Sequence, residues 1–199
     1  MPNPRLAQFN TEITRSRDLV GLGQSLGAMT HGRVDASDTF RAALTHAVAA
    51  LDTYIHGIVL DRAVDIVLGR VQAANAGAKV GLHFSAIQQI LVATSPADRE
   101  LAARTHVAQR LSLETFQKPD DVANALAMVG LNKIWSTAFN DAQSAKTALS
   151  LIVQRRNRIV HQCDADPITP GNLTPLSDSD ALNAIVTVEA TVAAIDKVI

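Results

Sequence analysis

The stretch LSLIVQRRNRIVHQCDAD, from Leu149 to Asp166, decides how this chain folds. Its apolar residues recur every three or four positions, which is the spacing of a helix with one buried face. They are Leu149, Ile152, Val153, Ile159, Val160 and Cys163. At about 100° per residue all six lie within about 60° of Arg156, so a permanent cation occupies the middle of the face predicted to be buried. Because burying an unpaired guanidinium is costly, Arg156 needs a carboxylate partner, an open groove or an anionic ligand.

The composition limits the class of protein. The chain has 199 residues, of which 47% are hydrophobic and only 4% aromatic, so we expect one all-α domain of helices packed through small side chains. A single cysteine excludes an intrachain disulfide, and no run of apolar residues reaches the length of a signal peptide core or a membrane span. These features favour a cytoplasmic protein that is not bound to a membrane. The net charge of −1 disfavours a broadly basic surface for duplex nucleic acid.

Prolines and capping residues predict where the helices lie. No proline occurs between Pro4 and Pro96 or between Pro119 and Pro167, and these gaps permit long helices. We expect a single domain, residues 1–199, whose N-terminal helix packs on a core of four others. The predicted ranges are 6–29 for the first helix and 38–68, 96–113, 143–164 and 177–199 for the core, with additional short helices at 83–93, 121–129 and 132–139. The glycine-containing stretch 69–81 and the proline-rich stretch 166–175 are predicted to be loops.

A second feature of the stretch is an arginine followed five positions later by a histidine. By composition alone, roughly 0.4 such pairs are expected, and Arg41 with His46 repeats the separation. Arg156 and His161 differ from that pair in the residues that surround them in the sequence. Asn157 follows the arginine directly, Arg155 and Arg158 add cations, and the predicted helix is about to end in a proline-containing loop.

With these residues the chain resembles the HEPN superfamily, whose motif is an arginine, often followed by asparagine, and a histidine four to six residues after the arginine. Flanking segments resemble the RiboL-PSP-HEPN branch in particular, so that the similarity covers most of the chain. The runs are FRAALTHAVAALDTYIHGIV at Phe40–Val59, ETFQKPDDVANAL at Glu114–Leu126, RRNRIVHQCDADP at 155–167, and the final helix. One departure is Gln162, which stands where we expect an acidic residue directly after the histidine.

The resemblance implies an up-and-down helical bundle, a homodimer that brings two Arg/His pairs into one groove, and endoribonuclease activity without a metal or other cofactor. Members typically act as toxins or antiviral nucleases, so an antitoxin or regulatory protein is a further expected partner. The expected substrate is RNA, single-stranded or tRNA, since the cations form one local patch.

The residue types suit this chemistry. An imidazole with an ordinary pKa near 6.5 can act as base or acid at neutral pH, which fits a catalytic role for His161. The planar guanidinium of Arg156 matches phosphate oxygens, and Asn157 can hold the phosphate or orient the histidine. Arg155 and Arg158 are candidate substrate-binding residues, and Asp52 is a candidate partner for Arg156 from the neighbouring helix. No metal site is expected.

Other interpretations of the same residues stay open. Arg156 can be a core arginine paired with Asp52, and His161 can be a histidine favoured by the dipole at the end of a helix. Arg155 and Arg158 can form a solvated face, while Cys163 on the apolar stripe is expected to be a small buried hydrophobe. The competing function is a non-catalytic dimeric module that binds nucleotide or RNA, or that acts as an antitoxin-like partner.

Overall fold

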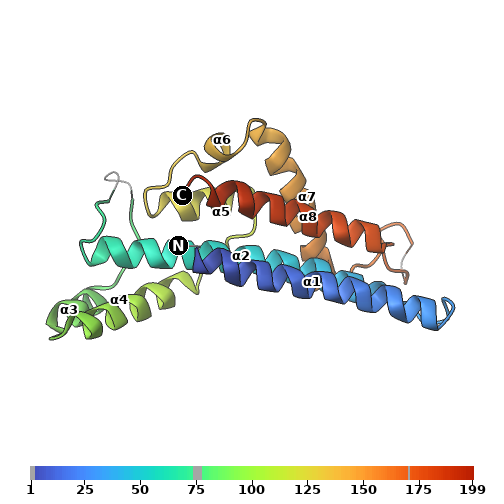
Figure 1. Ribbon diagram of the computed structural model, residues 1–199, viewed down its shortest axis with the longest axis horizontal. Helices are drawn as coiled ribbons and strands as arrows, with labels where there is room; N and C mark the ends of the chain where they lie inside the picture. The colour runs from blue at the N-terminus through green and yellow to red at the C-terminus, as the bar shows by residue number, and fades with distance from the viewer. Residues whose placement is uncertain (1–2, 74–77, 170) are drawn as a thin grey trace. The chain divides into compact units, whose positions relative to one another are not determined.

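The computed structural model describes residues 3–73, 78–169 and 171–199 (Figure 1). Over these residues the protein forms eight α-helices and no strand, which confirms the all-α prediction. The helices are α1 (Pro4–Met29), α2 (Ser37–Val67), α3 (Phe84–Val92), α4 (Pro96–Leu111), α5 (Pro119–Ala127), α6 (Ile134–Ala138), α7 (Ala142–Gln162) and α8 (Asp178–Asp196).

The predicted helices all form, and their observed bounds lie close to the predicted ones. The difference that bears on the candidate site is at the end of α7, which is predicted to reach residue 164 and ends at Gln162. Cys163 and Asp164 instead adopt left-handed φ angles of 50° and 53°. In the predicted loop 69–81, Asn75 and Gly77 lie outside the described residues.

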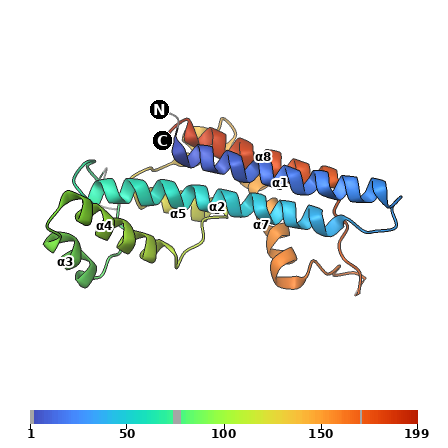
Figure 2. The same ribbon diagram turned by 60° about the horizontal axis from the view of Figure 1, so that its bottom comes forward.

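The chain divides into two compact units. The first comprises Met1–Tyr54 with Trp135–Val198, and the second comprises Ile55–Ile134 with Ile199. Helix α2 therefore contributes its first part to one unit and its second part to the other. All residues of the predicted site belong to the first unit. In the second unit, α3 lies beside α4, as both ribbon views show (Figure 2).

The core of the first unit lies between α1, the first part of α2, α7 and α8. Helix α8 runs along α1 and also contacts α7 (Figures 1 and 2). The apolar face of α2 includes Leu44, Val48 and Leu51, which follow one another at helical spacing and are fully or almost fully buried. The other large buried side chains of this unit include Phe9, Ile13, Val20, Tyr54, Leu149, Val153, Ile185, Val188, Val192 and Ile195. This apolar interior fixes α7 along its first half.

Gly23 allows α1 and α2 to approach closely. A Cβ atom added at this position would overlap the hydroxyl of Thr39 and the ring of Phe40, both at the start of α2. Gly21, Gly23 and Gly27 do not interrupt α1, which continues to Met29. Close packing at this point offsets the low helix propensity of glycine.

Helix α2 is long and apolar enough to cross a bilayer, judged by length and composition alone. Of its most apolar stretch, 56% is buried inside the protein. Core helices of water-soluble domains have the same composition, and the burial fits a core helix better than a lipid-facing one.

Candidate functional site in helix α7

Helix α7 is built as the sequence predicts over its first half. Asp141 caps its start by accepting a hydrogen bond from the backbone N–H of Ser144 at 3.0 Å. Leu149 and Val153 are buried, whereas Val160 is 46% exposed. The apolar face is therefore covered where α7 packs on its own unit and uncovered near its end. Cys163 is exposed as well, so the expectation that it is a buried hydrophobe is wrong, because the helix ends before reaching it.

Arg156 is half-buried, and no carboxylate of the described residues forms an ion pair with it. Its Nη1 donates a hydrogen bond to Oδ1 of Asn157 at 3.2 Å, and its buried Nε has no partner among the described residues. The suggested ion pair with Asp52 is not formed in the described part of the chain, although Asp52 is itself half-buried in α2. The adjacent Arg156 and Asn157 thus form a pair with unused hydrogen-bonding capacity on the guanidinium.

His161 is exposed in the last turn of α7. Across the described residues, no hydrogen bond engages its imidazole ring, so both ring nitrogens are available to solvent or to a ligand. It lies five positions after Arg156, which on a straight helix means a rotation of about 140° and a rise of about 7.5 Å. Within one chain the two side chains therefore leave α7 in different directions.

The other two predicted substrate contacts differ from each other. Arg155 is committed to the fold, because its Nη2 donates to Asp164 Oδ2 at 2.7 Å and to the carbonyl oxygens of Thr174 and Pro175 at 2.8 and 3.1 Å. This placement argues against a substrate-binding role for Arg155. Arg158 is half-buried and makes no such contact among the described residues. Of the two flanking cations, Arg158 is the one left available for a ligand.

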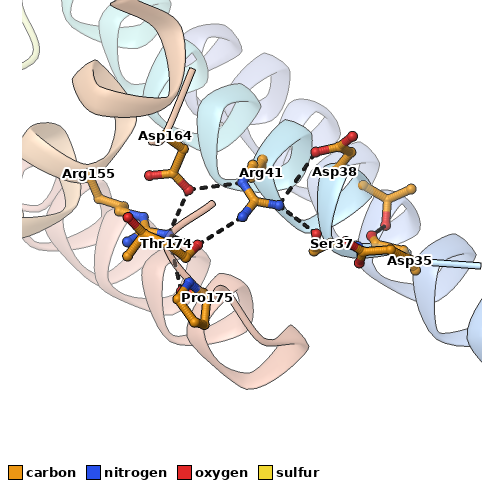
Figure 3. A network of polar contacts seen from close by, with 10 residues as sticks. Asp35, Ser37, Asp38, Arg41, Arg155, Asp164, Thr174 and Pro175 are labelled. Carbon is orange, nitrogen blue, oxygen red and sulfur yellow. Dashed lines mark hydrogen bonds and ion pairs between the residues drawn. The ribbon is translucent and has the colours of Figure 1, made fainter. Parts of the chain in front are cut away.

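A polar network that no sequence pattern indicates surrounds Arg155 (Figure 3). Its centre is Asp164, whose side chain is completely buried and whose Oδ2 also accepts a hydrogen bond from Nε of Arg41 at 2.9 Å. Arg41 is 6% exposed and donates further to Ser37 Oγ at 2.5 Å and to the carbonyl oxygen of Thr174 at 2.8 Å. In the sequence, Arg41 shows only the motif separation from His46, which composition alone explains. No pattern in the sequence links it to Asp164.

One carboxylate thus faces two guanidinium groups inside this network. Burial lowers the pKa of Arg155, and the charge of Asp164 works in the opposite direction. The remaining positive charge is met at longer range by Asp38, whose carboxylate lies 3.4 Å from Arg41 Nη1 and is exposed. Arg41 and Arg155 are therefore engaged in contacts that stabilise the fold. Arg156 takes no part in this network.

An apolar groove of about 760 Å³ runs between α1, α2 and the end of α7. Its lining residues are Leu19, Asp38, Arg41, Ala42, Thr45, His46, Ala49, Ile159, Val160, Cys163 and Leu173. On its α2 side the His46 ring is engaged at both nitrogens, with Nδ1 2.9 Å from Ser16 Oγ and Nε2 3.2 Å from Glu12 Oε2. His46 therefore ties α2 to α1, and the pair of Arg41 and His46 is structural.

Comparisons with known proteins add no further assignment. No family model, curated protein or solved structure matches this chain. The candidate site therefore rests on the residues of α7 and on the resemblance of its motif.

Proposed function

We propose that this protein is a metal-independent endoribonuclease whose active groups are Arg156, Asn157 and His161. In the proposed reaction the 2′-hydroxyl of RNA gives up its proton and attacks the adjacent phosphorus. The 5′-oxygen of the next nucleotide leaves and takes up a proton. The products are a 2′,3′-cyclic phosphate end and a 5′-hydroxyl end, so water is not a reactant in this step.

The observation that carries the proposal is the state of the Arg156 charge. Within the described residues, Arg41 and Arg155 both bind the carboxylate of Asp164, whereas Arg156 binds only the neutral amide of Asn157. A half-buried guanidinium without a counter-charge is suited to an anion, and its planar fork matches two oxygens of a phosphate. This arrangement supports a role in stabilising the charge that develops on phosphorus.

The exposure of His161 supports its role in proton transfer. Its ring is not held by another group of the described chain, so it is free to approach a substrate hydroxyl. General acid or base catalysis by such a histidine is worth about 10²- to 10⁴-fold in rate.

A homodimer would complete the site. On one helix Arg156 and His161 diverge by about 140°, so a single chain places only one of them well against a given phosphate. A second copy offers its own α7, and one His161 from each chain supplies the two proton transfers that the reaction needs. The groove lined by Ile159 and Val160 is an uncovered apolar surface next to the motif, which fits a surface for the second copy.

The biological setting that we propose follows from the family resemblance. The enzyme acts in the cytoplasm on single-stranded RNA or tRNA as a toxin or antiviral effector, and an antitoxin or regulatory protein restrains it. The alternative function is a non-catalytic dimeric module that binds RNA or nucleotide. The wide separation of Arg156 and His161 on α7 is the observation that favours this alternative, because an anion can bind at Arg156 without the histidine.

The experiment that tests the proposal uses purified protein with tRNA and unstructured RNA in the presence of EDTA. Wild type is compared with Arg156→Ala and His161→Ala. His83→Ala serves as the matched control, because His83 is an exposed histidine outside the first unit and its side chain caps no helix. We expect wild type and the control to leave 2′,3′-cyclic phosphate ends, and both motif variants to be inactive.

Two outcomes would contradict the proposal. If wild type binds RNA but leaves it intact, the binding module replaces the nuclease. If EDTA abolishes cleavage, or if both motif variants keep full activity, the active site lies elsewhere. A DNA copy of the best substrate, which lacks the 2′-hydroxyl, should bind and resist cleavage.

A further inference from the structure

The turn that ends α7 has an unusual backbone. Cys163 and Asp164 are two consecutive residues with positive φ, although neither is glycine. The left-handed conformation is unfavourable for residues with a Cβ atom, so such a turn needs contacts that hold it in place. The turn begins two residues after His161, and its geometry sets where the last turn of α7 ends.

Backbone hydrogen bonds close this turn in two directions. The N–H of Asp164 donates to the carbonyl oxygen of Arg158 at 3.0 Å, which caps α7. The carbonyl oxygen of Asp164 accepts from the N–H of Thr174 at 2.9 Å, and Ala165 pairs with Leu173 in an isolated antiparallel bridge. Asp164 is thus the residue at which the end of α7 is hydrogen-bonded to the returning segment of the loop, at Thr174.

The side chain of Asp164 is held by one arginine from α7 and one from α2. Arg155 lies on the same helix, so its bond to Asp164 only closes the turn on α7 itself. Arg41 belongs to α2, and its guanidinium reaches Asp164 Oδ2 and the carbonyl oxygen of Thr174 together (Figure 3). Arg41 is therefore the residue that fixes the turn relative to the rest of the first unit.

The burial of this network distinguishes it from the surface ion pairs of the same unit. The side chains of Arg41 and Asp164 are 7% and 0% exposed, whereas those of Arg17 and Glu189 in an ion pair between α1 and α8 are 39% and 40% exposed. When one partner of a buried charge pair is removed, water cannot reach the remaining charge to take the partner's place. In a surface pair, water can do so. Loss of Arg41 should therefore loosen the backbone at Asp164 and at the end of α7.

We infer that Arg41 is a positioning residue of the proposed site: through Asp164 it fixes the left-handed turn at the end of α7, and so the place of His161. The expected effect on catalysis rests on the proposed function, whereas the effect on the turn does not. Arg41 touches neither His161 nor Arg156 in the described structure, so it acts only through the turn. The guanidinium geometry matters, because Nε and Nη2 bind two different acceptors.

The test compares Arg41→Met and Arg41→Lys with the matched control Arg17→Met. The first readout is amide hydrogen exchange in the segment 161–175, measured where every variant is folded by circular dichroism. We expect at least a tenfold faster exchange at the amides of Asp164 and Thr174 in Arg41→Met, an intermediate effect in Arg41→Lys, and no change in the control. This readout needs no enzymatic activity.

The second readout is RNA cleavage by the same variants. We expect kcat of Arg41→Met to fall at least tenfold while KM stays within about twofold, because Arg156 still binds the phosphate. The lysine variant should recover part of kcat.

The outcomes separate the two proposals. Unchanged exchange in segment 161–175 of folded Arg41→Met would overturn the inference, whatever the activity. A kcat equal to wild type in a variant with fast exchange would also overturn it, since His161 would not depend on the turn. An inert wild type would overturn the proposed function, and the exchange comparison would still decide whether Arg41 fixes the turn. If Arg41→Met does not fold, Arg41→Lys carries the same comparison.

Discussion

Arg155 and Arg156 are adjacent in α7, but only Arg155 is bound to a carboxylate in the described chain. Its Nη2 lies 2.7 Å from Oδ2 of Asp164, whereas Nη1 of Arg156 donates a hydrogen bond to the amide oxygen of Asn157 at 3.2 Å. A single step along the helix, about 100° of rotation, thus separates an arginine used for folding from an arginine that is available for a ligand.

Replacing His161 by alanine should separate activity from stability. The ring is exposed and forms no hydrogen bond with the described residues, so His161→Ala should change the free energy of unfolding by no more than about 0.5 kcal/mol. RNA cleavage should fall by about 10²- to 10⁴-fold. Urea unfolding and initial cleavage rates measure the two effects, and a large loss of stability would show instead that the ring has a structural role.

Removing the carboxylate of Asp164 should strongly destabilise the protein. Asp164→Ala leaves Arg41 and Arg155 buried and facing each other, and breaking a buried pair in this way costs about 3–5 kcal/mol. Asp38→Ala is the matched control, because Asp38 also faces Arg41 but is 85% exposed, and it should cost less than about 1 kcal/mol. Chemical unfolding of both variants measures the difference. Equal losses would mean that burial does not decide the strength of these contacts.

The buried phenol of Tyr54 should make the protein sensitive to alkali. Burial, and then the hydrogen bond and charge of Asp196, raise the pKa of Tyr54 far above its usual value of about 10. The folded state therefore excludes the ionised form, and the stability is fully present below about pH 10. Above that pH the unfolded chain ionises first, so this contribution should be lost by about 1.4 kcal/mol per pH unit.

Tyr54→Phe tests this directly. The variant loses the hydrogen bond to Asp196, which should cost about 1 kcal/mol at neutral pH, and its stability should fall less steeply in alkali. Because Tyr54 is the only tyrosine, the ultraviolet absorbance of tyrosinate in wild type should appear only with unfolding. Ionisation of the phenol in the folded protein near pH 10 would contradict the assigned burial.

Two glycines of α1 should respond oppositely to alanine. Gly23→Ala places a Cβ against Thr39 and Phe40 and should cost about 1–3 kcal/mol. Gly21→Ala meets no atom within 4 Å and should stabilise the helix by up to about 1 kcal/mol. Thermal unfolding of the two variants is the measurement, and a stabilised Gly23→Ala would show that α1 and α2 can separate at no cost.

Local sequence rules were sufficient for the helices. Ser95, Pro96 and Asp98 form the capping pattern of a helix start, and the structure places Ser95 at the cap of α4 with its Oγ accepting from the N–H of Asp98 at 3.0 Å. In α2, apolar residues repeat every three or four positions at Leu44, Val48 and Leu51, and that face is buried. These signals act over a few residues, so a single sequence contains them.

Long-range polar contacts were not predictable in this way. Arg41 and Asp164 are 123 positions apart, and no periodicity connects them. Their bond also explains the error at the end of α7, because apolar spacing continued to Cys163 while the network holds Asp164 in a left-handed turn. Arg155 was assigned to substrate for the same reason: its sequence neighbours are cations, and its acceptors come from a distant loop.

The position of Cys163 gives the protein one chemically unique handle. It is the only thiol in the chain, it is exposed, and it lines the apolar groove beside Val160. A photoreactive maleimide attached there would form its covalent link with whatever molecule sits in the groove. A link between two copies of the chain would identify the dimer partner, and a link to RNA would trace the path of the strand past α7.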